Sequence, residues 1–487
     1  MKKLAGLVII LAALVLGGYY GMGVLTERTI RKNMEVMDQS NGLHAKIKNY
    51  NRGLFSSTAE IEWQLHIPQR VVTETNGTVQ TISAQDYTLG TPLIIHHGPV
   101  IFINDHMRFG MGYAESVFPF PHQYDAQFDS TFTKESIKPQ LDLSVFVNYS
   151  NYSTINSHVP AFHLYGKESN SRFDWSGMNM TTTMSPGMKK ISGTVDLDDI
   201  HIAKDDSTAD ISKASTDYDL HETLSGLYLG DANFKLPSFN IAVKGQKIFE
   251  IIDLIVKSDS DIEQHLFNSN FALTMKSIFA NAQNYGPGEL VMSLRNLDAD
   301  VLVKINQQAA AMQNGTDVQR QQALIALLPE LARLFSKGAE FEISKLSFTI
   351  PQGEVEGSLF VSLPKGENIN PFELMQKING KAKLKVPAAA VKELMRQSVI
   401  QQIAKQPDLQ QTLAQQLQGN QIVSTSENQP TLTVDQIASI QTEKQLSALQ
   451  QTGLITVLGT NYLIEVTLEQ GKFIVNGKPF DSAMLKF

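Results

Sequence analysis

The sequence predicts an α+β protein that is mostly β. One N-terminal transmembrane helix is followed by an elongated antiparallel β meander, with a few helices toward the C-terminal half. Three observations predict this fold: an uncharged apolar run opens the chain, alternating apolar and polar residues fill most of the body, and helical patterns appear late. The 487 residues suffice for roughly three domains, or for one large elongated one.

The first predicted element is a membrane anchor at residues 1–26. The uncharged run at residues 4–25 is long enough to cross ~30 Å of hydrocarbon as a single helix. Tyr19 and Tyr20 suit the membrane interface, and their bulk is unfavourable at the small-residue site where a signal peptide would be cleaved. An uncleaved anchor is therefore favoured over a cleaved signal.

Composition excludes several classes of protein. The chain has no cysteine, which rules out disulfides, cysteine-ligated metals and thiol nucleophiles. Its net charge of −8 argues against a nucleic-acid binder. Basic residues flank the anchor on both sides, so they do not decide its orientation. A large exported domain without thiols cannot misoxidise, which favours a single-pass protein of the bacterial inner membrane with the bulk of the chain in the periplasm.

Residues 27–300 are predicted to form a β-rich periplasmic domain. Apolar and polar residues alternate with a period of two in four stretches, at 59–67, 141–148, 195–198 and 289–295. This period gives a strand one buried face and one wet face, which is typical of antiparallel sheets.

Residues 301–487 are predicted to continue with mixed helices and strands. The strand pattern returns at 355–363, 382–386 and 462–475. Helical patterns cover about 317–337, about 388–404, and a third stretch that runs from the capping box at Thr433 and Gln436 to about 449. The glutamine-rich segment 401–429 is expected to be a frayed helix followed by a loop.

Four short blocks stand out along the chain. They are Tyr-Asn-Arg-Gly-Leu-Phe-Ser-Ser at 50–57, His97-Gly98-Pro99, Tyr285-Gly286-Pro287-Gly288 with Leu297-Asp298, and Gly-Lys-Phe-Ile-Val-Asn-Gly-Lys at 471–478. Together they resemble the YdgA-like family of uncharacterised bacterial inner-membrane-anchored proteins, over essentially the whole chain. The resemblance implies an envelope location and self-association, and it carries no catalytic residues to transfer. A more distant likeness, in strand-rich anchored architecture only, is to AsmA-type envelope proteins linked with lipid transport.

Three residues in these blocks are candidates for a ligand or partner contact. Arg52 could hold an anion, Phe55 could serve as an apolar anchor, and His97 stands in the second block. The favoured alternative for residues 50–57 is a strand entry in which Gly53 supplies a bend.

The sequence predicts no metal site, no cofactor and no enzyme. His96 and His97, with Asp105 and His106 nearby, are metal-ligating residue types. Adjacent strand residues point to opposite faces, however, so the two histidines are poorly placed to share one ion. The catalytic and nucleotide-binding motifs of hydrolases, kinases and dehydrogenases are absent, although two carboxylates distant along the chain could still act together.

The leading functional hypothesis is a non-enzymatic envelope protein held in the inner membrane by residues 4–25. A long series of one-sided strands with few helices to cover them suggests a groove on the apolar face, which would bind an acyl chain or an outer-membrane component during envelope biogenesis or maintenance. The alternative is a structural or interaction module that homodimerises at the inner membrane through strand edges or through the helix at 388–404, without a bound ligand.

Overall fold

The computed structural model describes residues 2–38, 43–67, 70–73, 79–103, 106–168, 170–224, 226–313, 327, 330, 332–366, 376–406, 413 and 432–480. The chain forms two compact units. The first comprises Met1–His265 and Ala299–Leu331, and the second comprises Leu266–Asp298 and Ala332–Phe487. The chain passes between the units after His265, Asp298 and Leu331.

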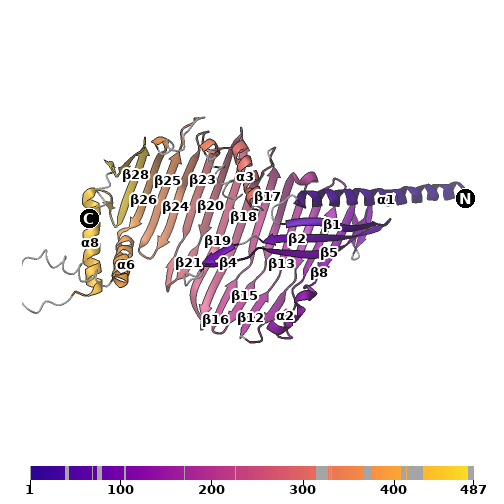
Figure 1. Cartoon of the computed structure of the whole chain (residues 1–487), viewed down its shortest axis with the longest axis horizontal. Helices are drawn as coiled ribbons and strands as arrows, with labels where there is room; N and C mark the ends of the chain where they lie inside the picture. The colour runs from indigo at the N-terminus through magenta and orange to yellow at the C-terminus, as the bar shows by residue number, and fades with distance from the viewer. Residues whose placement is uncertain are drawn as a thin grey trace, which may run out of the picture. The chain divides into compact units, whose positions relative to one another are not determined.

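Helix α1 (Lys2–Asp38) opens the first unit and continues well beyond the predicted anchor, over 37 residues. It runs alongside β1 (Leu43–Arg52), and its N-terminal half extends past the sheet (Figure 1). Ile30 and Met34 lie one turn apart and pack against a core cluster of the sheet that includes Ile61 and Ile95. Among the described residues, no helix combines the length and the hydropathy that crossing a membrane requires.

Most of the first unit is one antiparallel sheet, as the alternating patterns predicted. Neighbouring strands pair from β1 through β2, β5, β8, β9, β10, β13, β14, β17 and β18 to β19. A second row, β11–β12–β15–β16, joins β18 along the edge that β17 also uses. The strand bounds are β2 Ser56–Ile67, β5 Gln85–His97, β8 Gly112–Phe118, β9 Leu141–Val147, β10 Ser153–Val159, β11 Phe162–Tyr165, β12 Ser171–Trp175, β13 Met178–Met184, β14 Lys190–Leu197, β15 Ile200–Lys204, β16 Ser207–Ile211, β17 Ala214–Glu222, β18 Tyr228–Val243 and β19 Gln246–Glu263.

Smaller elements of the first unit include two hairpins and two helices. The two hairpins form two-stranded sheets of their own, β3–β4 (Arg70–Thr73 and Val79–Ile82) and β6–β7 (Val100–Ile103 and His106–Phe109). Helices α2 (Asp125–Thr131) and α3 (Ala299–Gln313) were not predicted. The β6–β7 hairpin extends the β5–β8 pair, because the N–H of Gly98 donates to the carbonyl of Met111 at 2.7 Å and the N–H of Gly110 donates to the carbonyl of Pro99 at 3.3 Å.

The second unit is also an antiparallel sheet, with strands paired in the order β20, β23, β24, β25, β26, β28, β29 and β30. Short β27 also pairs with β28, and β21 pairs with β22. The bounds are β20 Leu266–Met275, β21 Ser277–Ala280, β22 Gln283–Tyr285, β23 Gly288–Asp298, β24 Glu340–Ile350, β25 Gly353–Ser362, β26 Asn379–Pro387, β27 Thr456–Leu458, β28 Asn461–Glu469, β29 Lys472–Val475 and β30 Lys478–Pro479. The strands predicted at 289–295, 355–363, 382–386 and 462–475 are therefore confirmed.

Two of the predicted late helices are present and pack on each other. They are α6 (Ala388–Lys405) and α8 (Val434–Thr452), joined by a buried cluster of Val399, Ile403, Ile437 and Ala438. The capping box is formed as predicted, since Thr433 Oγ1 accepts from the N–H of Gln436 at 3.3 Å and the Gln436 side chain accepts in return at 2.9 Å. The predicted helix at 317–337 and the glutamine-rich segment 401–429 fall mostly outside the described residues.

Candidate functional site

Residues 50–57 span the end of β1, the tight turn at 53–55 and the start of β2. The N–H of Gly53 donates to the carbonyl of Ser56 at 2.9 Å, which closes the turn. The N–H of His97, the last residue of β5, donates to the carbonyl of Phe55 at 2.8 Å. Two of the blocks singled out in the sequence are thus joined, and the bend at Gly53 agrees with the strand-entry interpretation.

The structure brings Arg52, Phe55 and His97 together, and all three contact α1. Arg52 Nη1 donates to the Glu27 carboxylate at 3.1 Å, and the guanidinium lies 5.2 Å from the centroid of the Tyr20 ring. The positive charge of Arg52 is therefore already paired with α1. The Phe55 ring meets the Tyr19 ring edge to face, with centroids 4.9 Å apart. We call these three residues the α1 clasp.

His97 is the buried member of the α1 clasp. Its Nδ1 lies 3.1 Å from the carbonyl of Leu54, which can only accept, so Nδ1 carries the proton and Nε2 accepts from Ser57 Oγ at 2.8 Å. Burial, helped by the nearby Arg52 charge, holds the His97 pKa below its ordinary 6.5 and keeps the ring neutral. The ring packs directly on Gly23 of α1, where a Cβ would lie only 2.6 Å from Nδ1.

Ser57 and His97 have the residue types of a nucleophile and its base, but their geometry is that of a support. Both side chains are buried, and Nδ1 faces a backbone carbonyl where a catalytic histidine would face a carboxylate. The turn that follows His97 is also closely packed, because a Cβ on Gly98 would lie 1.7 Å from the carbonyl oxygen of Gly110. Next to this turn, Thr26 Oγ1 donates to the carbonyl of Met111 at 3.0 Å. These contacts fix the register of α1 on the sheet.

The histidines considered for a metal site are separated by the strand geometry. His96 and His97 are consecutive on β5, and His97 faces α1. His106 is exposed on β7, and Asp105 lies outside the described residues. In the part of the chain that the structure describes, no group of three or more histidines and carboxylates could hold a metal ion.

An apolar cavity lies between α1 and the sheet, beside the α1 clasp. Its volume is ≈ 260 Å³, with one wall formed by α1 and the other by six strands. The α1 wall consists of Thr26, Thr29, Ile30 and Met34. The sheet wall consists of Ile61 and Trp63 (β2), Thr91, Leu93 and Ile95 (β5), Gly112, Tyr113 and Ala114 (β8), Leu143, Val145 and Val147 (β9), Ser153, Ile155 and Ser157 (β10), and Met180 and Met184 (β13).

Among the residues that the structure describes, those that line this cavity carry no charge. Two of its buried polar atoms, Trp63 Nε1 and Thr91 Oγ1, have no hydrogen-bond partner among the described residues. An uncharged apolar cavity does not retain water well, whereas a hydrocarbon chain fits it. The indole N–H can only donate, so it would be satisfied by an acceptor such as a carbonyl oxygen.

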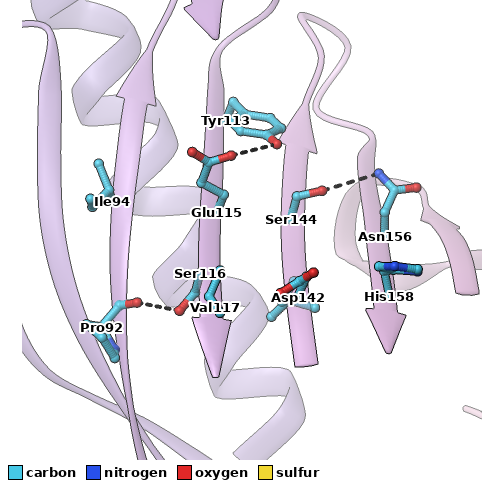
Figure 2. Close-up of a pocket in the computed structure, with 11 residues that line it drawn as sticks. Pro92, Ile94, Tyr113, Glu115, Ser116, Val117, Asp142, Ser144, Asn156 and His158 are labelled. Atoms are coloured by element: carbon cyan, nitrogen blue, oxygen red, sulfur yellow. Dashed lines mark hydrogen bonds between the residues drawn. The ribbon is translucent and has the colours of Figure 1, made fainter. Parts of the chain in front are cut away.

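The opposite face of the same strands carries an open hollow of ≈ 550 Å³, shown in Figure 2. Its polar groups partner one another: Tyr113 OH donates to Glu115 at 3.1 Å, and Asn156 Nδ2 lies 3.5 Å from Ser144 Oγ. Because these groups are already satisfied and the hollow is wide and shallow, the cavity beneath α1 is the stronger candidate for a ligand site.

Sequence reasoning selected the residues of the α1 clasp and expected a groove on the apolar face of the sheet, but it identified α1 neither as the partner of the clasp nor as a wall of the cavity. Ile30 and Met34 have the spacing of one helical face and follow the predicted anchor directly. That spacing was the available signal that α1 continues onto the sheet.

Comparison with known proteins places the chain in a family. The model of a family described as "Bacterial protein of unknown function (DUF945)" matches residues 1–483. No curated protein and no solved structure matches the chain. Since the match spans almost the full length, this chain belongs to the DUF945 family of bacterial proteins of unknown function.

Proposed function

We propose that this protein is a membrane-anchored envelope protein that binds a hydrocarbon chain of a lipid in the cavity beneath α1. The observation that carries the proposal is the uncharged lining of that cavity, with α1 as one wall and the apolar face of the sheet as the other. Each methylene moved from water into such a site contributes ~0.8 kcal/mol, and no charged partner is needed.

The size of the cavity limits how much of a ligand it can enclose. Small-molecule sites usually measure ~300–1,000 Å³, and ≈ 260 Å³ lies just below that range. The cavity would therefore enclose part of one acyl chain, with the headgroup remaining outside. The unpartnered Trp63 N–H would suit the carbonyl of an acyl ester near the start of the chain. We propose binding without chemistry, because the Ser57–His97 pair is buried against α1.

The proposed location is the bacterial inner membrane, with a single pass at residues 4–25 and the body in the periplasm, as in proteins of the YdgA-like kind. The uncharged run and the absence of cysteine support this location. The alternative of a homodimerising module has less support, because the buried face of α6 packs against α8 of the same chain.

A cavity-filling variant tests lipid binding. Ala114 is buried and lines the cavity, so Ala114→Phe should occupy its space. Ile94→Phe is the matched control, because Ile94 is exposed on the opposite face of β5. In Trp175→Phe protein, Trp63 is the sole tryptophan of the chain and lies in the cavity wall.

The full-length chain is placed in bilayers that contain lipids with bromine atoms on their acyl chains, which quench tryptophan fluorescence on contact. We expect strong quenching of Trp63 in the background protein and in Ile94→Phe, and several-fold weaker quenching in Ala114→Phe. The amount of lipid that co-purifies with the protein, quantified by mass spectrometry, should also be lower for Ala114→Phe. Equal quenching in all three proteins, with Ala114→Phe shown to be folded by circular dichroism, would overturn the proposal.

A further inference from the structure

The β6–β7 hairpin has one exposed apolar face. Cross-strand pairs Val100–Phe109 and Phe102–Met107 lie on this face. The exposed fractions of Phe102, Met107 and Phe109 are 70%, 55% and 57%. Isolated exposed apolar residues are ordinary on protein surfaces, but a hairpin face composed of them usually marks a binding surface.

The other face of the hairpin is attached to the body of the first unit. Ile101 is fully buried, and its cross-strand partner Arg108 places its guanidinium 5.2 Å from the Tyr113 ring and 5.8 Å from the Phe146 ring. Ile101 and Arg108 thus pack the second face of the hairpin against the body of the first unit. The exposed face is therefore presented outward by a fixed support.

The start of the hairpin contacts α1 within the uncharged run of the helix. Tyr19 OH donates to the carbonyl of Val100 at 2.7 Å. Tyr149 OH donates to the neighbouring carbonyl of Pro99 at 2.5 Å. About one and a half turns from Tyr19 toward the N-terminus of α1, Leu14 is 70% exposed. From the end of β5 into the following turn, the contacts with α1 move from Gly23 at His97 to Gly18 at Pro99, so the chain advances toward the N-terminal end of the helix.

The β1–β2 turn adds to this surface. Phe55 is exposed apart from its contact with Tyr19, and Leu54 beside it is also exposed. We call the five exposed residues Leu54, Phe55, Phe102, Met107 and Phe109 the apolar rim. The rim contains three aromatic side chains, and Tyr19, Tyr20 and Tyr149 stand next to it, which is the composition of a membrane–water interface.

We propose that the apolar rim inserts into the leaflet of the membrane from which α1 emerges, so that the body is seated on the bilayer at a second point. The proposal rests on the proposed membrane anchor. A bilayer is the occupant that the structure favours, because the rim adjoins the uncharged run of α1. Arg28 and Lys32 are exposed roughly 2.5 and 3.6 turns beyond Tyr19 along the helix, where they are placed for anionic headgroups.

The natural absence of cysteine makes the test direct. Single-cysteine variants of the full-length chain, Phe102→Cys and Met107→Cys, are labelled with an environment-sensitive fluorophore and reconstituted in vesicles of phosphatidylethanolamine and phosphatidylglycerol. Leu14→Cys reports on α1. Ile202→Cys, at an exposed apolar position of β15, is the control. Each protein is measured with and without lipids that carry a nitroxide quencher on the acyl chain.

We expect the labels at Phe102 and Met107 to emit as in an apolar medium and to be quenched several-fold more strongly by the nitroxide lipids than the label at Ile202. A blue-shifted emission without lipid quenching would indicate that a second protein copy covers the rim, and would overturn the proposal. Water-like emission at Phe102 and Met107 with strong quenching at Leu14 would also overturn it, while leaving the anchor intact. Weak quenching at Leu14 as well would refute the anchor and, with it, this inference.

Discussion

Replacing His97 with alanine tests whether the α1 clasp holds the helix on the sheet. The substitution removes two hydrogen bonds and the ring that packs on Gly23. Ser57 Oγ would be left buried without its partner, which costs about 1–3 kcal/mol. The vacated volume adds roughly 1–2 kcal/mol at ~24 cal/mol per Å³. The Leu54 carbonyl belongs to an exposed turn and can bind water instead. We expect a total loss of about 2–5 kcal/mol in the unfolding free energy of the first unit.

Tryptophan fluorescence follows this unit specifically, because Trp63 and Trp175 both lie in it and are the only tryptophans of the chain. In Trp175→Phe protein, Trp63 packs with Ile30 and Met34 of α1 against the same core cluster, so its emission reports on docking of the helix. Denaturant titration of the full chain in detergent gives the free energy. His66→Ala is the control, since His66 is exposed and pairs with Asp86 at 2.6 Å. It should change stability by less than ~1 kcal/mol.

The pH dependence supplies a second measurement on the same residue. The folded-state pKa of His97 lies below its ordinary 6.5, so the unfolded chain binds the proton more readily. The stabilisation from the neutral ring is present above about pH 6.5 and is lost as the pH falls through the folded-state pKa. His97→Gln keeps one donor and one acceptor but cannot titrate, so its stability relative to wild type should improve on acidification. A His97→Ala loss no larger than that of His66→Ala, or a His97→Gln difference that does not vary with pH, would refute this account of the α1 clasp.

Three further substitutions probe neighbouring contacts. Gly23→Ala should weaken docking of α1 because the added Cβ would meet His97. The control Gly21→Ala meets nothing within 4 Å and should gain helix propensity, up to ~1 kcal/mol. The rate of proteolysis within α1 distinguishes the two variants, and equal rates would contradict the close packing at Gly23. Arg52→Gln should lower the free energy of unfolding by less than ~1 kcal/mol, and the effect should fade at high salt because the ion pair of Arg52 with Glu27 is partly exposed. A loss of stability that does not depend on salt in denaturant titration would contradict this interpretation. Thr433→Ala should destabilise α8 by ~1 kcal/mol through loss of the capping box, while Ser439→Ala inside the helix should be nearly neutral, as judged by thermal unfolding of the helical signal.

The regular strands and the two packed late helices could be predicted because their signals are local. Ala59, Ile61 and Trp63 alternate along β2, and Thr433 with Gln436 marks the start of α8. Helix α3 was missed because Val301-Leu302-Val303 has the β-branched character of a strand and follows one directly. The continuation of α1 was missed because its charged residues suggested the end of an anchor.

The residues of the site could be selected from the sequence, but their contacts could not, because those contacts are not local. Arg52, Phe55 and His97 stand out as chemistry-bearing residues in unusual local sequences, so they could be selected. What they do depends on Glu27, Tyr19 and Gly23, which are distant along the chain and unremarkable by themselves. The cavity has no local signature, because its walls are the same alternating apolar residues that build any one-sided sheet.

The distribution of these features bears on what the cavity can recognise. The residues with specific geometry, the α1 clasp and the tight turn at Gly98, fasten α1 and do not line the cavity. The lining itself is generic hydrocarbon with a few hydroxyl groups. A stereospecific ligand would require several placed polar groups, whereas an acyl chain requires only width, length and the exclusion of water. Because α1 is both the fastened element and a wall of the cavity, loosening the α1 clasp should open the site. His97→Ala should therefore lower the quenching of Trp63 by brominated lipid as well as the stability of the unit, and a loss of stability with unchanged quenching would separate the α1 clasp from the ligand site.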